Sequence, residues 1–75
     1  MNKLTDFKKG SKVKIAQITA GYGAKRNLMN LGLSEGNIIE IKRISSLKGP
    51  VVVLLDNTEI AIGHGLAQKI SVEGI

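Results

Sequence analysis

The spacing of apolar and polar residues predicts a chain built mostly from short β-strands. Val13 and Ile15 alternate with lysines, and Ile39 and Ile41 alternate with charged residues, which is typical of strands with one buried face. Turns rich in glycine, serine and asparagine separate these segments. The expected strands span residues 12–15, 37–44, 51–55, 60–62 and 69–72, and a loop is expected over residues 45–50.

Two of these strands depart from simple alternation. Ile15 and Ile18 would face opposite sides of a regular strand, so a bulge near residues 16–17 is needed to bury both. Residues 51–55 are apolar on both faces, which predicts a central strand covered on both sides. The turn after it predicts a hairpin, in which Asn57 is the expected residue with a positive φ angle.

One segment has the period of a helix instead. Ala24, Leu28 and Leu31 fall on one stripe, which predicts a helix over residues 24–31. Gly32 follows directly, and a glycine at this place can take the left-handed conformation that ends a helix. The helix is therefore expected to pack on the strands through this stripe.

The residues after the helix are expected to hold it in place. In a helix end of this type, Leu33 folds back onto Leu28. Gly36 belongs to the turn of residues 34–37 that leads into the next strand. The expected structural positions of the chain are Leu28, Leu31, Gly32, Leu33, Gly36 and Asn57.

The number and length of these elements predict a fold class. Five short strands, tight turns and one short helix in 75 residues predict a mainly β fold, a small antiparallel barrel with an inserted helix. A chain of this length forms one domain, here residues 1–75. Closure of the barrel would remove the exposed strand edges that favour aggregation of apolar strands.

Charge and aromatic content narrow the classes of partner. The net charge of +5 favours acidic partners, such as nucleic acid, anionic lipid or an acidic protein surface. A charge of this size is also typical of a small domain that is simply kept soluble. With one Phe and one Tyr, the chain has few rings for base stacking, which disfavours a nucleic-acid partner.

Three features of the sequence favour a cytoplasmic location. The chain has no cysteine, which fits a reducing compartment. Its first residues are not followed by the apolar core of a secretory signal. The longest apolar run, residues 51–55, is too short to span a bilayer. We therefore expect a cytoplasmic protein without membrane insertion, either a monomer or a weak homo-oligomer.

The sequence contains no set of reactive side chains that would indicate an enzyme. His64 is the sole histidine and lies between two glycines, where we expect an exposed corner residue rather than a base or a metal ligand. The carboxylates are scattered, so the sequence predicts no metal site. Gly21 and Gly23 precede the helix without the rest of a phosphate-binding motif. We therefore expect a non-enzyme without a cofactor.

Four residues in or beside the helix are candidates for binding a partner. Lys25 and Arg26 fall in the first turn of the expected helix, where the helix dipole disfavours cations, so a binding role would explain their place. Tyr22 could anchor an interface, and Met29 could supply an adaptable contact. The alternatives are a solvated basic surface for the cations and a place at the edge of the core for Tyr22 and Met29.

The order of these motifs resembles the FeoA family, small cytoplasmic proteins that accompany the FeoB ferrous-iron transporter of bacteria. The resemblance extends over residues 4–72, and its matching residues include three of the four candidates, Lys25, Arg26 and Met29. It is carried by Lys25, Arg26, Leu28, Met29, Leu31, Gly32, Leu33 and Gly36, and then by Gly49, Pro50, Val51, Val53, Ile60, Ala61, Ile62, Gly63, Ala67, Ile70 and Val72. The chain departs from many members at residues 48–50 and 62–63, and no partner contact is carried over from these positions.

This resemblance implies an SH3-like barrel with an added helix. It also implies an accessory role in ferrous-iron transport, through protein–protein interaction with the cytoplasmic part of FeoB. Transition-metal ion binding is associated with the family, but the resemblance does not imply that this chain binds iron stably. The alternative function is a basic SH3-like module that binds nucleic acid through the lysine-rich residues 8–14.

Overall fold

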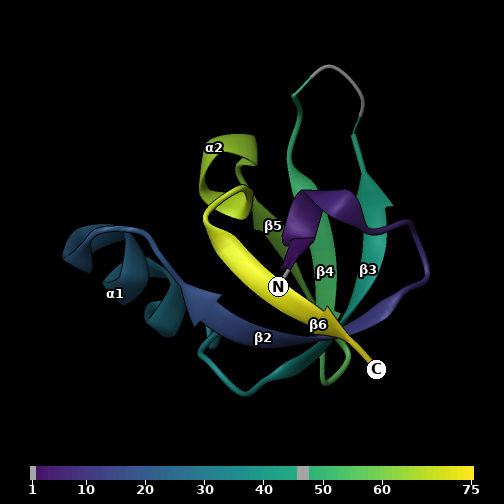
Figure 1. The fold of residues 1–75 in the computed structure, drawn as a ribbon, viewed down its shortest axis with the longest axis horizontal. Coiled ribbons are helices and arrows are strands. Elements are labelled where there is room, and N and C mark those ends of the chain that lie inside the picture. The colour runs from purple at the N-terminus through teal and green to yellow at the C-terminus, as the bar shows by residue number, and fades with distance from the viewer. Residues whose placement is uncertain (1, 46–47) are drawn as a thin grey trace.

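Six antiparallel strands form one strongly bent sheet in the computed structural model, which describes residues 2–45 and 48–75 (Figure 1). The strands follow the order β1-β6-β2-β3-β4-β5 in the sheet. The elements are β1 (Asn2–Lys3), the 3₁₀ turn η1 (Leu4–Asp6), β2 (Lys12–Ile18), α1 (Tyr22–Asn30), β3 (Ile38–Ile44), β4 (Val51–Leu55), β5 (Thr58–Ile62), α2 (His64–Ala67) and β6 (Ile70–Gly74). The mainly β fold with a short inserted helix is thus confirmed.

The sheet contains one strand that the sequence did not predict, and it is not closed. The unexpected strand, β1, pairs with β6, but its two residues are too few to show an alternating pattern. The end strands of the described sheet are β1 and β5, so the expected closure of the barrel was wrong. The chain enters η1 after β1 and α2 after β5, and these two helical turns contact each other. In a closed barrel the two end strands would be hydrogen-bonded to each other. Here the contact between η1 and α2 connects the segments that follow these two strands.

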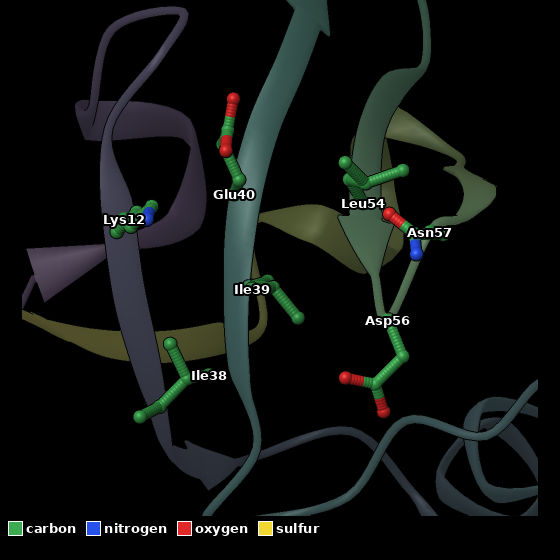
Figure 2. A pocket seen from close by; sticks show the side chains of 7 residues that line it. All are labelled: Lys12, Ile38, Ile39, Glu40, Leu54, Asp56 and Asn57. Atoms are coloured by element: carbon green, nitrogen blue, oxygen red, sulfur yellow. The ribbon is translucent and has the colours of Figure 1, made fainter.

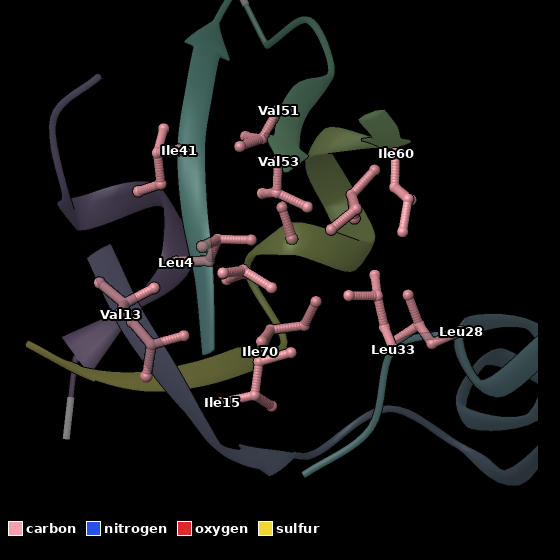
Figure 3. Close-up of a cluster of buried hydrophobic side chains, with 14 of the residues drawn as sticks. Leu4, Val13, Ile15, Leu28, Leu33, Ile41, Val51, Val53, Ile60 and Ile70 are labelled. Atoms are coloured by element: carbon pink, nitrogen blue, oxygen red, sulfur yellow. The ribbon is translucent and has the colours of Figure 1, made fainter. Parts of the chain in front are cut away.

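The concave side of the sheet encloses an aliphatic core (Figure 3). No polar or charged side chain is buried among the described residues. The core consists of Leu4, Val13, Ile15, Ile18, Leu28, Leu33, Ile39, Ile41, Val51, Val53, Ile60, Ile62, Ala67, Ile70 and Val72. Buried residues alternate with half-buried or exposed ones in β2, β3, β5 and β6, which confirms the alternation predicted from the sequence.

The predicted bulge in β2 is present. The register of β2 against β6 shifts between Ile15 and Gln17, and both Ile15 and Ile18 face the core as a result. A second shift interrupts β3 between Ile41 and Arg43. Because a bulge bends its strand and increases the twist, these two positions help the sheet to curl around the core.

The strand β4 lies inside the sheet but is not covered on both sides. Val51 and Val53 face the core, whereas Val52 and Leu54 are only half-buried, so the expectation of two covered faces was wrong. In the sheet β4 lies between β3 and β5. The Arg43–Glu59 ion pair spans from β3 to β5 at 3.2 Å.

The expected hairpin turn after β4 is present, whereas the expected loop before β4 lies partly outside the described residues. Asn57 has a φ angle of 69°, as predicted, and Asp56 before it has a φ angle of 48°. Two consecutive left-handed residues form the type I′ turn that suits a two-residue hairpin, here between β4 and β5. Residues 46–47 of the predicted loop 45–50 lie outside the described residues.

The helix α1 ends at a left-handed Gly32, as the sequence predicted. The amide of Gly32 donates to the carbonyl of Met29 at 2.9 Å, and the amide of Leu33 donates to the carbonyl of Leu28 at 2.9 Å. Together with the φ angle of 94° at Gly32, these bonds define a Schellman motif. Leu28 and Leu33, the apolar pair of this motif, are both fully buried.

Replacing two glycines of this region by alanine should have opposite effects on stability. Gly32→Ala should destabilise the fold by about 1–2 kcal/mol, because an L-residue is strained in the left-handed region. The new methyl group would lie 3.8 Å from Leu55, so steric clash adds nothing. Gly23→Ala, inside α1 and next to open space, should stabilise it by about 0.5–1 kcal/mol. Urea unfolding measures both changes, and equal effects would contradict this explanation of the helix end.

Candidate partner-docking site

The helix α1 begins two residues earlier than the sequence suggested. It spans Tyr22–Asn30, and Gly21 precedes it in an extended conformation without a side-chain cap. The sequence predicts a loop at the glycines around Tyr22, although both fit the start of a helix here. Lys25 and Arg26 therefore lie at the fourth and fifth helical positions. Their expected place in the first turn was wrong, and the dipole effect falls off beyond that turn.

Only one large side chain of α1 reaches the core. Leu28 is fully buried, but Leu31 is 52% exposed, so the expected attachment through Leu31 was wrong. Leu31 caps the helix, and the chain turns away at Gly32 before a second inward position can form. Figure 1 shows α1 standing beyond the end of β2, at one extremity of the molecule.

The four candidate residues are brought together on the exposed side of α1. Tyr22 is 82% exposed and Met29 is 61% exposed, so neither lies at the edge of the core. A groove of about 390 Å³ is lined by Tyr22, Lys25, Arg26, Met29 and Asn30, and we call these five residues the docking face. The segment that forms α1 contains no acidic residue, so the face is basic and partly apolar.

Asn30 is the member of the docking face that sequence reasoning missed. Tyr22, Arg26, Met29 and Asn30 are spaced i, i+4, i+7 and i+8, which places them on one face of a helix. This signal was present in the sequence, but it becomes visible only when the helix begins at Tyr22.

Glu35 connects α1 to the end of β2. One carboxylate oxygen of Glu35, Oε2, accepts a hydrogen bond from the amide of Ile18 at 3.1 Å. The same oxygen lies 3.5 Å from Nζ of Lys25. The hydrogen bond from Ile18, and next the charge of Lys25, lower the pKa of Glu35. Lys25 thus has a structural partner that its sequence context did not show, since Glu35 lies ten positions further along the chain.

The turn that carries Glu35 is itself held against β2. The amide of Gly36 donates to the carbonyl of Ile15 at 2.7 Å, and the amide of Ile15 donates to the carbonyl of Asn37 at 2.8 Å. The side-chain oxygen of Asn37 accepts a hydrogen bond from the amide of Ser34 at 2.7 Å. Gly36 has a φ angle of 97°, which agrees with its expected role in this turn. The Glu35 side chain therefore extends from an ordered backbone.

A second hollow lies on the outer face of the sheet (Figure 2). It has a volume of about 240 Å³ and an exposed apolar residue, Ile38, at one side. Charges of both signs surround it, so it has no uniform electrostatic preference. Its lining residues are Lys12, Ile38, Ile39, Glu40, Leu54, Asp56 and Asn57.

The described residues contain no grouping of three or more His, Cys, Asp or Glu side chains that could hold a metal ion. His64 is half-buried at the start of α2, rather than exposed as expected. Its Nε2 atom lies 3.1 Å from the side-chain nitrogen of Gln68. Within the part of the chain that the structure describes, no helix is both long enough and apolar enough to cross a membrane.

Comparisons with known proteins show the family of the chain. The FeoA domain family matches residues 2–74. A protein of Methanocaldococcus jannaschii named "Putative Fe(2+) transport protein A" is 40% identical over 73 residues, covering 97% of this chain and 87% of that protein. The chain belongs to the FeoA domain family.

Solved structures share the fold. The crystal structure of an iron uptake regulatory protein (FeoA) has a TM-score of 0.85 and 27% sequence identity, covering 99% of this chain and 96% of that chain. A manganese-dependent transcriptional repressor has a TM-score of 0.90 and 21% identity, covering 99% of this chain but 41% of that one. The repressor shows a likeness of fold alone. The FeoA structure agrees with the SH3-like barrel that the sequence resemblance implied.

The lowered pKa of Glu35 predicts a loss of stability in acid. In the pH range between the folded and unfolded pKa values, the unfolded chain binds more protons, so stability rises with pH. The contribution of Glu35 is complete above its ordinary pKa of 4.5 and is lost as the pH falls through the lower folded value. Glu35→Gln should therefore be less stable than the wild type at pH 7, and this difference should shrink at pH 3.

Urea unfolding at both pH values measures this effect. Glu73→Gln is the matched control, because Glu73 has no side-chain hydrogen bond or ion pair with any described residue. A difference between Glu35→Gln and the wild type that stayed constant from pH 7 to pH 3 would contradict the assigned role of the carboxylate.

Proposed function

We propose that this chain is a non-enzymatic accessory protein of ferrous-iron uptake. It acts in the cytoplasm, as a single domain without a cofactor, by binding the cytoplasmic part of the FeoB transporter through the docking face. Membership of the FeoA family and the relative named as an Fe(2+) transport protein support the pathway. The observation that carries the site is the exposed, acid-free groove on α1.

The chemistry of the docking face suits a protein partner. Tyr, Met and Arg are enriched at protein–protein interfaces, and Tyr and Arg are frequent energetic hot spots. Tyr22 and Met29 project large apolar surfaces that the core does not use. Arg26 lies between them on the same helix face, where it can form a bidentate pair with a carboxylate. The complementary surface on the partner is therefore acidic with apolar contacts.

The alternative of nucleic-acid binding gains no support from the lysine-rich residues 8–14. Strand register places Lys12 opposite Glu40 and Lys14 opposite Glu73. An acidic residue in register with each of these two lysines lowers the net positive charge of this surface. The ring of Tyr22 is exposed, but stacking platforms combine several aromatic rings along a basic groove.

Reversing one charge of the docking face should weaken binding to the transporter. Arg26→Glu should lower the affinity for the purified FeoB cytoplasmic domain by at least about tenfold, since a central charged contact becomes repulsive. Lys9→Glu makes the same change in net charge at the loop before β2, away from α1 (Figure 1). It should change affinity much less. Isothermal titration calorimetry at two salt concentrations measures both effects.

Folding and binding are separated by thermal unfolding of the same two variants. Both substituted residues are exposed, so both variants should unfold close to the wild-type temperature. Equal affinity losses in Arg26→Glu and Lys9→Glu would leave only a general charge effect and remove the docking face from the proposal.

A further inference from the structure

We propose that Glu35 is a positioning residue for the docking face. Its oxygen Oε2 holds the amide of Ile18 in β2 and the ammonium group of Lys25 in α1 at the same time. This inference rests on the proposed function, because it assigns how the docking face is presented to its partner. Lys25 then helps to hold the helix in place, and Arg26 is the cation that contacts the partner.

The amino-terminal half of α1 has few other attachments. Gly21 supplies no side-chain cap, and Tyr22, Gly23 and Arg26 are exposed. The buried side chain Leu28 and the Schellman motif lie in the second half of the helix. A nine-residue helix is marginal without tertiary support. The contact of Lys25 with Glu35 is therefore the charged link that holds the first half against the barrel.

Glu35 differs from the other carboxylate that forms a described ion pair. The Arg43–Glu59 pair and the Lys25–Glu35 pair have similar exposure, and ion pairs this exposed contribute little by themselves. Only Glu35 also accepts a backbone amide, which is part-buried and belongs to the bulged end of β2. The shared oxygen makes the position of Lys25 depend on the position of β2, and so it fixes the angle at which α1 leaves the sheet.

A charge-swapped variant tests whether the shared oxygen matters. Glu35→Gln should speed amide hydrogen exchange at Lys25 and Arg26, the first helix residues whose amides bond within the helix. The increase should be about two- to fivefold, the range expected from surface ion pairs, and the amides of β3 and β4 should stay unchanged. Glu59→Gln is the matched control and should leave α1 unchanged. Lys25→Glu combined with Glu35→Lys restores an ion pair, but lysine cannot accept the bond from Ile18. In Glu35→Gln the side-chain amide oxygen can still accept the bond from Ile18, so each variant loses a different one of the two contacts. Both variants should therefore exchange faster than the wild type.

Two exchange results would overturn the inference. One is wild-type exchange in the charge-swapped variant, which would make Glu35 an ordinary ion-pair partner. The other is exchange in Glu35→Gln that equals exchange in Glu59→Gln.

The affinity for the FeoB cytoplasmic domain gives a second test, in which the sign decides. Glu35→Gln makes the chain more positive and releases Lys25, so simple attraction to an acidic partner would tighten binding. Positioning predicts the opposite, an affinity about two- to fivefold weaker, because the helix is less fixed. Tighter or unchanged binding would overturn the inference. If the wild type itself does not bind this domain, the proposed function fails, while the exchange experiment still tests the hold of Glu35 on α1.

Discussion

A single sheet can enclose a core only by curling around it, and the rest of this structure depends on that constraint. One face of the strands carries the aliphatic side chains, and no second sheet is present in the described chain to cover them. Full burial of a Val, Leu or Ile side chain stabilises a fold by about 1.5–3 kcal/mol. In so small a domain this burial outweighs what exposed ion pairs can add. The bulges in β2 and β3 supply part of the necessary bend.

The open parts of the curled sheet are filled by residues outside the strands. Leu4 enters from η1 and Ala67 from α2, while Leu28 and Leu33 enter from the two sides of the α1 helix end. The Schellman motif at Gly32 brings the last two together, so the helix is fixed to the core at one end. The exposed face of the helix does not pack into the core, so residues on that face can be substituted without exposing core side chains.

Local patterns predicted most of the fold, and non-local contacts explain the errors. Alternation identified the longer strands, the spacing of Ile15 and Ile18 identified the bulge, and Asn57 and Gly32 identified a hairpin and a helix end. Each of these depends on residues close together in sequence. The pairing of β1 with β6 joins the two ends of the chain. Closure of the sheet and the exposure of Leu31 likewise depend on how distant segments meet.

The candidate site shows the same division within two adjacent residues. Lys25 and Arg26 have the same charge and similar sequence surroundings, and sequence reasoning assigned both to the same outward face. In the structure Lys25 lies against Glu35, whereas Arg26 has no described carboxylate within ion-pair distance. Glu35 reaches Lys25 only because the turn after α1 runs back along β2, where Gly36 and Asn37 bond to Ile15. The path of the backbone between residues 32 and 37 thus separates a cation that supports the helix from one that is free to bind.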